Sequence, residues 1–289
     1  MRSLSPTATA VGVAALRALY SDMPAPLGFV SDPFAARLLP RPMGALTRIV
    51  RARPTLARFV HRALRIVTRD LSLSTPLRTL AIDDALRVAI EGGARQFVLL
   101  GSGLDSRAWR CRELANASVF ELDRAPTHEY KKARMRGVQI VAARHAYVPV
   151  DFERDELSRV LLQAGFNPEV PTVWLWEGVI IYLPHQATHG TIRVVASMSA
   201  PGSSLIATYT CPGLGGAGRP TVHLRLGARL VGEPIAGEVS TRDLHAWLSQ
   251  HGLQVDRDEP VNGWAPRVMP HGELLTGPDW ERVFVASKR

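Results

Sequence analysis

Short apolar runs recur through the middle of the chain, and each is followed by a segment whose apolar residues have helical spacing. The runs lie at residues 97–100, 118–122, 146–150, 172–176 and 204–209. The helical segments lie at 104–114, 126–136, 155–164 and 184–198. Apolar runs of this length are typical of buried parallel strands. Their alternation with helices predicts an α/β fold with a doubly wound parallel sheet.

The two ends of the chain depart from this alternation. Before the first strand only helices are expected, at residues 7–20, 32–39, 54–69 and 76–91. After residue 210, a segment rich in Gly and Pro precedes a last helix and two strands, at 241–251, 253–259 and 282–287. We therefore predict one domain spanning 1–289. Its parts are a helical cap, a core, a lid insertion and a C-terminal part of the core, at 1–92, 93–210, 211–239 and 240–289.

Two glycines follow the first strand and predict a nucleotide-binding turn. Gly101 and Gly103 let the backbone turn tightly and approach a ligand with no side chain in between. Asp123 ends the second strand, twenty residues after Gly103. An acidic residue at that point accepts hydrogen bonds from both hydroxyls of a ribose. The chain thus contains half of a nucleotide-binding fold.

The residues after the turn indicate which nucleotide binds. In the dinucleotide fingerprint a small residue stands there, so that the helix dipole meets a pyrophosphate. Here Ser106 stands between Asp105 and Arg107, and the Asp105 carboxylate would lie where a phosphate should bind. This favours a nucleoside without phosphate, such as S-adenosyl-L-methionine (SAM), over a phosphate-bearing nucleotide or a coincidental turn. Another G-x-G-x-x-G match, at 213–218, leads into no clear helix, and we read it as a lid loop.

Acidic residues also end the third and fourth strands. Ligands of open α/β sheets lie across the carboxyl ends of the strands. On this basis Asp123 binds the ribose, Asp151 accepts from the adenine amino group, and Phe152 covers the adenine ring. Glu177 ends the fourth strand and completes the set. Asp151 alone could be a helix cap, but acids at three successive strand ends favour a shared ligand.

Several motifs stand in order along the first two thirds of the chain. They read Val-Ala-Ala-Leu-Arg-Ala-Leu from residue 13, Ser-Asp-Pro-Phe-Ala from 31, Leu-Arg-Thr-Leu-Ala-Ile-Asp-Asp from 77, Gly-Ser-Gly-Leu-Asp-Ser-Arg-Ala-Trp-Arg from 101, Phe-Glu-Leu-Asp from 120 and Trp-Glu-Gly-Val-Ile-Ile-Tyr-Leu-Pro from 176. In order and spacing, over roughly residues 8–200, the chain resembles the leucine carboxyl methyltransferase-like family. The likeness is strongest to its branch of SAM-dependent methyltransferases common in mycobacteria and related actinobacteria. The last third of the chain matches weakly.

The resemblance implies a class I SAM-dependent methyltransferase fold, with seven strands and an antiparallel last strand. It implies that Arg78 pairs with the methionine carboxylate, for which a guanidinium fork is suited. Tyr182 matches a position that lines the family's acceptor pocket and is the candidate catalytic residue. Glu177 would receive the methionine ammonium or orient the loop that follows it. The family also favours O-methylation, in particular of a carboxylate on a small molecule.

The acceptor group decides whether a general base is needed. A carboxylate is already ionised at pH 7, because its pKa is about 4, whereas a hydroxyl usually needs a base. The histidines that could serve are His145, His185, His189 and His223. None stands in a recognisable pair, so we expect structural roles for them. No Cys/His spacing indicates a metal site, and no metal is expected.

The distribution of charge adds a feature that the family does not explain. The formal net charge is +9, and ten Arg against a single acid, Asp70, fall between residues 33 and 82. In the predicted helix at 54–69 four of them share one face: Arg58, Arg62, Arg65 and Arg69. The opposite face is apolar: Leu56, Phe59, Val60, Ala63, Leu64 and Val67. The arginine stripe is either a solvated surface or a basic face for an acidic partner or an anionic membrane.

Composition bounds the class of protein further. With 289 residues, 46% of them hydrophobic, the chain can bury a large core. Its two cysteines, Cys111 and Cys211, imply no disulfide framework, as in a cytoplasmic protein. The longest apolar runs fall short of the roughly 18 residues of a membrane span, and we read residues 8–19 as a helix rather than a signal peptide. The alternatives to a methyltransferase are an NAD-type oxidoreductase and a SAM-binding protein without turnover.

Overall fold

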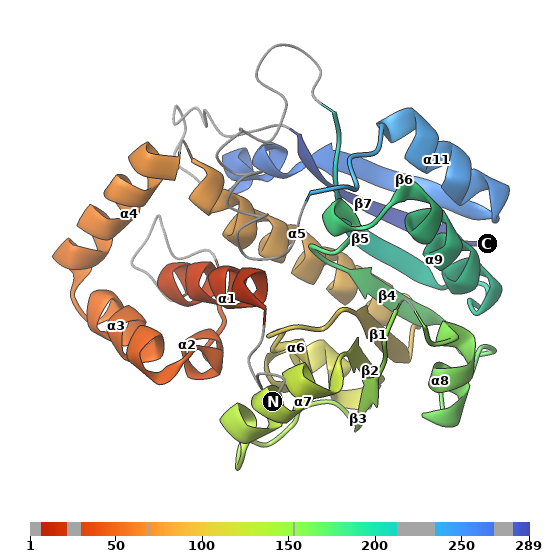
Figure 1. Cartoon of the computed structure of the whole chain (residues 1–289), viewed down its shortest axis with the longest axis horizontal. Helices are drawn as coiled ribbons and strands as arrows, with labels where there is room; N and C mark the ends of the chain where they lie inside the picture. Colours follow the sequence, from red (N-terminus) through yellow and green to blue (C-terminus); the bar gives the residue numbers. More distant parts are fainter. Residues whose placement is uncertain (1–6, 22–29, 69, 153, 213–234, 269–279) are drawn as a thin grey trace.

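A seven-stranded sheet with helices on both faces forms the body of the protein (Figure 1). The computed structural model describes residues 7–21, 30–68, 70–152, 154–212, 235–268 and 280–289. The strands are β1 (Gln96–Leu100), β2 (Ser118–Asp123), β3 (Arg144–Pro149), β4 (Thr172–Trp176), β5 (Ser204–Thr210), β6 (Leu253–Pro260) and β7 (Glu281–Lys288). Their order in the sheet is β3-β2-β1-β4-β5-β7-β6.

Five strands are parallel, and the last strand runs against them. β1 pairs with β2 and β4, β2 pairs with β3, and β4 pairs with β5, all in parallel. β7 lies antiparallel between β5 and β6, as the family resemblance implies. The strand order reverses between β1 and β4, so their carboxyl ends border the crevice in which such sheets bind ligands.

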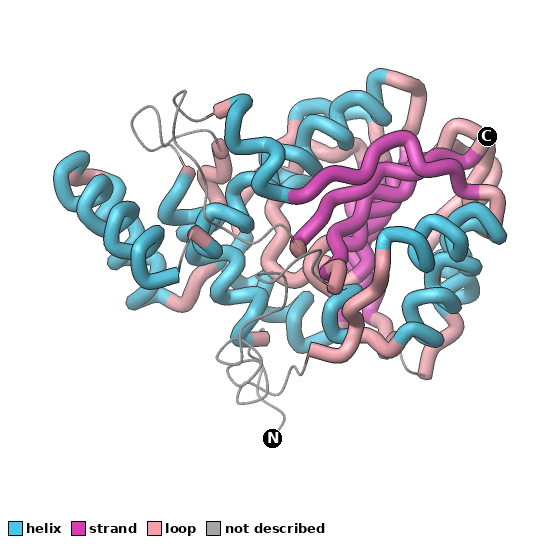
Figure 2. The backbone as a smooth tube through the Cα atoms, turned by 90° about the horizontal axis from the view of Figure 1, so that it is seen from above, coloured by secondary structure: helices cyan, strands magenta, loops and turns pink. Residues whose placement is uncertain are grey.

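Both faces of the sheet are buried. In β1, Phe97 and Leu99 belong to one core and Val98 and Leu100 to the other, because successive side chains of a strand alternate. α5 (Leu71–Glu91) covers the first core. The second core lies under α8 (Leu157–Gln163), α9 (His185–Ser197) and α11 (Thr241–Gln250). Figure 2 shows the strands between these helices. Burial on both sides explains why β1 and β4, at the centre of the sheet, are almost wholly apolar, whereas the edge strand β3 is only partly buried.

The helix expected at 104–114 is wrong, because it is broken in two. Only α6 (Arg107–Arg110) and the 3-10 helix η1 (Arg112–Asn116) form, since Cys111 between them is extended, at φ −86° and ψ 107°. Residues 101–106 form a turn instead of helix. The following helix, α7 (Ala125–Met135), lies where the sequence predicts it.

The described residues before β1 form five helices, one more than expected. They are α1 (Ala8–Tyr20), α2 (Ala35–Leu38), α3 (Arg41–Arg51), α4 (Pro54–Thr68) and α5. Thr7 caps α1, its Oγ1 accepting from Ala10 N. α3 is absent from the prediction because Pro42 reads as a terminator, whereas it stands in the first turn of α3, where proline is tolerated. In Figure 1, α1 to α4 lie together beside the sheet, and α5 reaches from them to the strands.

α4 does not bury the face that its sequence predicts. Its buried residues are Ala57 and His61, whereas Phe59 is 70% exposed and Val67 is 81% exposed. The reason is that α4 packs on α3 and α5 along the line of Ala57 and His61, where the His61 ring meets Tyr20 of α1 at 5.3 Å between centroids. The apolar side therefore splits, and Phe59 and Val67 lie outside the core.

The arginine stripe of α4 is only partly as expected. Arg58 and Arg62 are exposed. Arg65 is half-buried, and its Nε donates to Asp70 Oδ1 at 2.7 Å. Arg69 lies outside the described residues. The exposed surface of α4 thus combines two arginines with apolar side chains.

Three further expectations concern the rest of the chain. Most of the predicted lid insertion, including the G-x-G-x-x-G match at 213–218, lies outside the described residues. Cys111 and Cys211 are buried free thiols, in agreement with the prediction of no disulfide framework. In the described ranges, every helix is too short or too polar to cross a membrane.

Candidate active site

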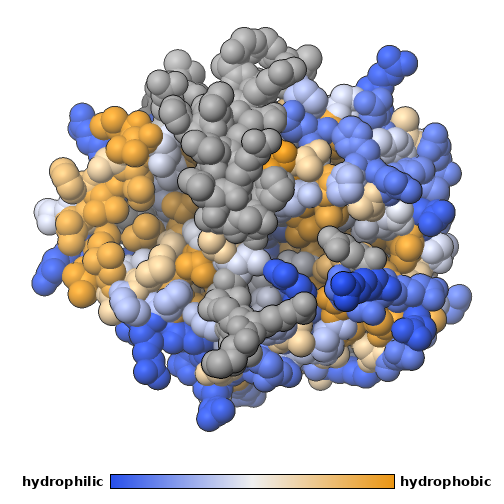
Figure 3. Space-filling view, in the orientation of Figure 1, coloured by the Kyte–Doolittle hydropathy of each residue, from blue (hydrophilic) through white to orange (hydrophobic). Residues whose placement is uncertain are grey.

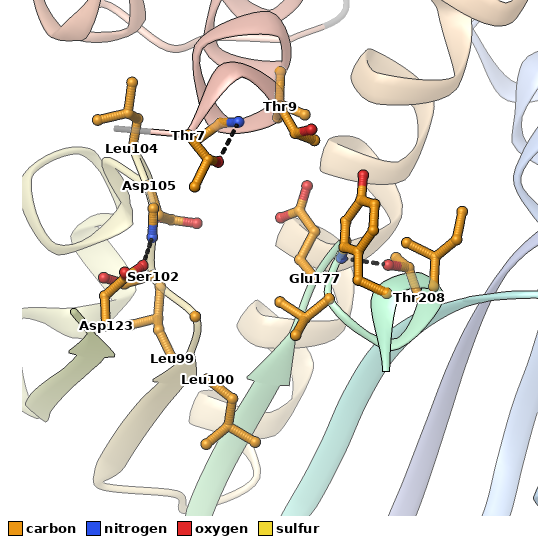
Figure 4. Close-up of a pocket in the computed structure, with 18 of the residues that line it drawn as sticks. Thr7, Thr9, Leu99, Leu100, Ser102, Leu104, Asp105, Asp123, Glu177 and Thr208 are labelled. Carbon is orange, nitrogen blue, oxygen red and sulfur yellow. Dashed lines mark hydrogen bonds between the residues drawn. The ribbon is translucent and has the colours of Figure 1, made fainter. Parts of the chain in front are cut away.

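A cavity of about 1470 Å³ opens at the carboxyl ends of β1, β2, β4 and β5. α1, α5 and the 3-10 helix η2 (Ile180–Tyr182) complete its wall. All site residues expected from the sequence line it: Arg78, Gly101, Gly103, Asp123, Asp151, Phe152, Glu177 and Tyr182. Figure 4 shows Asp123 and Asp105 across this space from Glu177 and Thr208. The fold therefore gathers residues from distant parts of the chain around one space.

The glycine turn has the backbone geometry that only glycine adopts readily. Gly101 has φ +77° and Gly103 has φ +46°, both in the left-handed region. A Cβ atom on Gly101 would lie 2.8 Å from Cγ2 of Val179, which is closer than carbon atoms approach. The N–H groups of Gly101 and Ser102 both donate to Leu122 O at 2.9 Å, which fixes the turn on β2.

Asp123 links the end of β2 to this turn. Its Oδ2 accepts from Gly103 N and its Oδ1 accepts from Arg124 N, both at 2.7 Å. These two bonds hold the carboxylate in one orientation beside the cavity. Each carboxylate oxygen has a second lone pair, so Asp123 retains the capacity to accept from a ligand hydroxyl.

Asp151 and Phe152 lie at another edge of the cavity, just after β3. Asp151 is half-buried, and its N–H donates to Asp155 Oδ2 at 2.8 Å. The Phe152 ring is 41% exposed although it is large and apolar. An exposed aromatic ring beside a carboxylate on a cavity wall is suited to stacking on a flat heterocycle.

Arg78 and Glu177 belong to a buried network of charges. Arg78 donates from Nε to Glu177 at 3.0 Å and from Nη1 to Glu281 at 2.7 Å. The other oxygen of Glu177 accepts from Arg107 Nη1 at 3.0 Å. Burial raises the pKa of Glu177, but Arg107 and Arg78 outweigh it and hold the pKa below its usual value. Glu177 is therefore an ionised carboxylate at neutral pH.

The Asp105 carboxylate is not the free negative charge that the sequence suggests. Asp105 is buried, one of its oxygens contacts Arg107 Nη1, and the other accepts from Arg107 N at 2.7 Å. Burial raises the pKa of Asp105, and Arg107 overcomes this and lowers it well below its usual value. Because Arg107 balances its charge, Asp105 alone does not exclude a phosphate. Another observation has to decide the ligand.

That observation is a match to a family. The sequence model of the family described as leucine carboxyl methyltransferase matches residues 10–196. The chain belongs to the leucine carboxyl methyltransferase family. The resemblance seen in the sequence motifs is thereby confirmed. As a member of this family the protein is a SAM-dependent methyltransferase, and the alternative of an NAD-type oxidoreductase is set aside.

Relatives named as SAM-dependent methyltransferases support this membership. One from Mycobacterium bovis (strain BCG) is 35% identical over 259 residues, which cover 86% of this chain and 80% of the relative. One from Mycobacteroides abscessus is 34% identical over 271 residues, covering 87% and 84%.

Two solved structures are similar over nearly the whole chain. A DUF574 family protein from Streptomyces avermitilis has a TM-score of 0.63 at 14% identity, with 98% of both chains covered. A methyltransferase from Thermobifida fusca has a TM-score of 0.63 at 16% identity, covering 100% of this chain and 97% of the other. At such identities the likeness concerns the fold alone, and it confirms the class I methyltransferase fold.

Glu281 and Ser74 of this family member are site residues that sequence reasoning missed. Glu281 begins β7, bonds to Arg78, and contacts the Ser74 hydroxyl of α5. It reaches the cavity because β7 is antiparallel, so Glu281 pairs with Thr210 at the carboxyl end of β5. The signal in the sequence was an acidic residue at the first position of a strand that runs against the others.

The remaining wall of the methyltransferase cavity is largely apolar. It includes Val13 and Leu16 of α1, Leu71 of α5, Ile181, Leu183, Ile235 and Trp280. Ile235 comes from the described end of the predicted lid insertion. The N–H of Gly237, two residues later, donates to Ile181 O at 2.9 Å and ties this end to η2.

The described histidines that were considered as general bases lie outside this wall. Histidine is absent from the described residues that line the cavity. His145 contacts Glu121 at 3.0 Å, His185 contacts Glu238 O at 2.7 Å, and His189 contacts His251 at 3.2 Å. His223 lies outside the described residues. His145, His185 and His189 thus have partners outside the cavity wall, and a structural role stays the prediction for them.

Proposed function

We propose that this methyltransferase transfers a methyl group from SAM to an oxygen atom, of a carboxylate or a hydroxyl, on a small molecule. The observation that supports this most is the cavity, which contains the expected cofactor residues and extends past them to an apolar wall. Its volume of about 1470 Å³ exceeds the roughly 300–1,000 Å³ typical of a pocket for one ligand. SAM and an acceptor therefore fit in it together.

In this proposal SAM lies across the ends of β1, β2 and β4. Asp123 accepts from the ribose hydroxyls, Asp151 accepts from the adenine amino group, and Phe152 covers the adenine. Gly101 and Gly103 allow the backbone to come close. All five line the same cavity, which supports these roles.

Arg78 and Glu177 hold the methionine end. Two guanidinium nitrogens of Arg78 donate to carboxylates, while Nη2 has no hydrogen bond within the described part of the chain. Nη2 lies beside Gly178, where an added Cβ atom would come within 3.5 Å of it. A donor aimed at this turn suits the methionine carboxylate. The ionised Glu177 then binds the ammonium or orients residues 178–183.

The chain contributes alignment rather than acid–base chemistry. SAM supplies an activated methyl group, so the protein has to hold the acceptor oxygen in line with it. Such positioning is worth roughly 7–11 kcal/mol of a reaction barrier. Tyr182 lines the cavity and is proposed as the residue that positions the acceptor. A carboxylate acceptor needs no base, which agrees with the lack of histidine among the described lining residues.

The division of the domain follows from this function. We propose that the cap (1–92) and the insertion (211–239) shape the acceptor pocket, while 93–210 and 240–289, together with Arg78 of the cap, hold the cofactor. The support is that α1 and Ile235 contribute apolar side chains to the cavity. Acceptor choice would then depend on the parts of the chain that carry the fewest family motifs.

The test is the formation of S-adenosylhomocysteine with matched acceptors. A long-chain carboxylic acid, its alcohol and its amine, equal in length, differ only in the accepting group. We expect turnover with the acid or the alcohol above the rate without acceptor. Turnover with the amine alone would contradict O-methylation.

A further inference from the structure

An apolar surface lies on the outside of the cap, away from the cavity. Nine large hydrophobic residues of the described chain are exposed, and six of them lie on α3 and α4. We call these six the cap patch: Met43 (39% exposed), Leu46 (61%), Ile49 (48%), Phe59 (70%), Ile66 (68%) and Val67 (81%). Figure 3 shows hydrophobic residues gathered over α3 and α4, at the left of the view. Scattered exposure needs no explanation, but six neighbours on two packed helices indicate a binding surface.

Arginines surround the cap patch. Five exposed arginines of α3, α4 and their connection have guanidinium groups without a hydrogen-bond or ion-pair partner within the described residues: Arg41, Arg48, Arg53, Arg58 and Arg62. The sequence has no Asp or Glu between Asp32 and Asp70, so nothing acidic along these helices balances them. Unpaired guanidinium groups beside exposed apolar side chains call for a partner that is both anionic and apolar.

On α4 the two kinds of side chain share one face. Arg58 and Arg62 are four residues apart, and Phe59 and Ile66 stand three and four residues from Arg62. Residues at these spacings are neighbours on a helix surface. The buried residues Ala57 and His61 mark the opposite side. The arginines therefore form one edge of the apolar surface.

We propose that the cap patch binds the surface of an anionic lipid membrane. In this arrangement Phe59, Ile66 and their apolar neighbours enter the boundary between headgroups and acyl chains. The arginines extend to the lipid phosphates, which guanidinium groups bind in bidentate fashion. A second copy of this surface is a poor partner, because a symmetric pairing would place arginines against arginines.

Binding there brings the outer layer of the cap against the lipid. α1 and α5, on which α3 and α4 pack, carry residues of the cavity wall. The apolar cavity of the proposed function thus lies one helix layer from the membrane. The membrane inference itself rests on the cap patch and not on the acceptor, so it is tested without turnover.

The test is cosedimentation of the full chain with vesicles of phosphatidylglycerol and phosphatidylcholine in equal parts. We expect binding at about 0.1 M salt that weakens towards 1 M, because the Debye length shrinks from about 10 Å to about 3 Å. Vesicles of phosphatidylcholine alone should bind far less. R58Q/R62Q should weaken binding about fivefold per arginine removed, the equivalent of about 1 kcal/mol each.

Matched variants separate the patch from general surface effects. F59Q/I66Q removes two apolar side chains of the patch without changing charge, and it should weaken binding at both salt concentrations. V88Q/L162Q removes two apolar side chains of 56% and 51% exposure on α5 and α8, outside the cavity and the patch, and should bind like the wild type. R112Q/R159Q is the corresponding control for charge, because both arginines are exposed elsewhere.

Three results would overturn the proposal. The first is a wild type that fails to sediment with anionic vesicles at low salt. The second is equal weakening by the patch and control variants. The third is self-association of the wild type in analytical ultracentrifugation that F59Q/I66Q abolishes, with vesicle binding unchanged in this variant. That result would assign the cap patch to contact with a second copy of the chain. SAM affinity, measured alongside by calorimetry, should be the same in all variants and shows that each is folded.

Discussion

At the scale of single residues, Arg78 connects three parts of the chain. Its guanidinium joins Glu177 after β4 and Glu281 at the start of β7, while its backbone belongs to α5. Burying such charges costs free energy of desolvation, and their mutual hydrogen bonds offset that cost only while every partner is present. The network therefore fixes Arg78 before any ligand arrives, as a precise binding site requires.

The sequence predicts the part of the site that follows from strand ends. Asp123, Asp151 and Glu177 were expected at one edge because parallel strands carry their carboxyl ends to the same side. The sequence did not predict Glu281 as a site residue, because its position at the cavity depends on β7 running antiparallel to β5. The ion pair between Asp105 and Arg107 forms in an irregular turn, and sequence spacing does not predict where side chains point in such a turn.

Asp123→Ala should lower SAM affinity tenfold or more. The variant loses hydrogen bonds to a charged group, which contribute about 1.5–3 kcal/mol each. The SAM affinity of Asp123→Asn, which keeps one oxygen acceptor, should lie between that of the wild type and that of Asp123→Ala. Calorimetric titration with SAM measures all three proteins. Asp256→Ala is the control, because Asp256 lies on β6, outside the cavity, where it accepts a hydrogen bond from Ser287 of β7. Unchanged affinity in a folded Asp123→Ala variant would remove Asp123 from the site.

At the scale of elements, burial decides which predictions held. The five parallel strands were found within about two residues of their bounds, and four of them, β1, β2, β4 and β5, are buried along most of their length, which leaves an apolar signal. The apolar face of α4 was misjudged because its periodicity gives an amphipathic helix but not the side on which neighbours pack. Helix bounds in the cap were mispredicted at prolines, since Pro42 lies in the first turn of α3 and Pro76 lies inside α5.

The glycine turn offers an element-scale test with a matched control. Gly101 and Gly137 both have φ +77°, so alanine at either position costs roughly 1–2 kcal/mol of backbone strain. Only at Gly101 would the new methyl group meet Val179, at 2.8 Å, whereas nothing lies within 4 Å at Gly137. We expect Gly101→Ala to lower both the melting temperature and SAM affinity, and Gly137→Ala to lower the melting temperature alone. Equal SAM affinity in the two variants would mean that the turn does not touch the ligand.

At the scale of the whole molecule, charge is divided between two surfaces. Acidic side chains outnumber arginines in the cavity wall, with Asp105, Asp123, Asp151, Asp155, Glu177 and Glu281 against Arg17, Arg78 and Arg124. Such a wall complements the sulfonium and ammonium groups of SAM. The positive excess lies instead on the outer helices of the cap. The net charge of +9 therefore reflects the outer surface of the cap and not the cavity, whose wall is mainly acidic.

Buried titratable groups also couple the whole fold to pH. Burial lowers the pKa of His128 below its usual 6.5 and outweighs the attraction of Glu121 and Asp123. The ring is buried against Tyr147, and neither nitrogen has a hydrogen-bond partner among the described residues. The folded chain thus binds this proton more weakly than the unfolded chain does. The contribution of His128 to stability is therefore complete above about pH 6.5 and is lost as the pH drops below that value.

We expect the melting temperature of the wild type to fall between pH 7 and pH 5, before the carboxylates of the site titrate. His128→Phe keeps a ring against Tyr147 and removes the titrating group, so its melting temperature should fall less over this range. One group accounts for at most about 1.4 kcal/mol per pH unit, which differential scanning calorimetry at constant ionic strength resolves. His185→Gln, at an exposed histidine, should follow the wild type.

Below about pH 4.5 the wild type and His128→Phe should both lose stability, because Glu177 has a pKa below its usual 4.5 when folded and must take up a proton as the chain unfolds. Parallel curves for wild type and His128→Phe between pH 7 and pH 5 would show that another group sets the acid sensitivity of the fold.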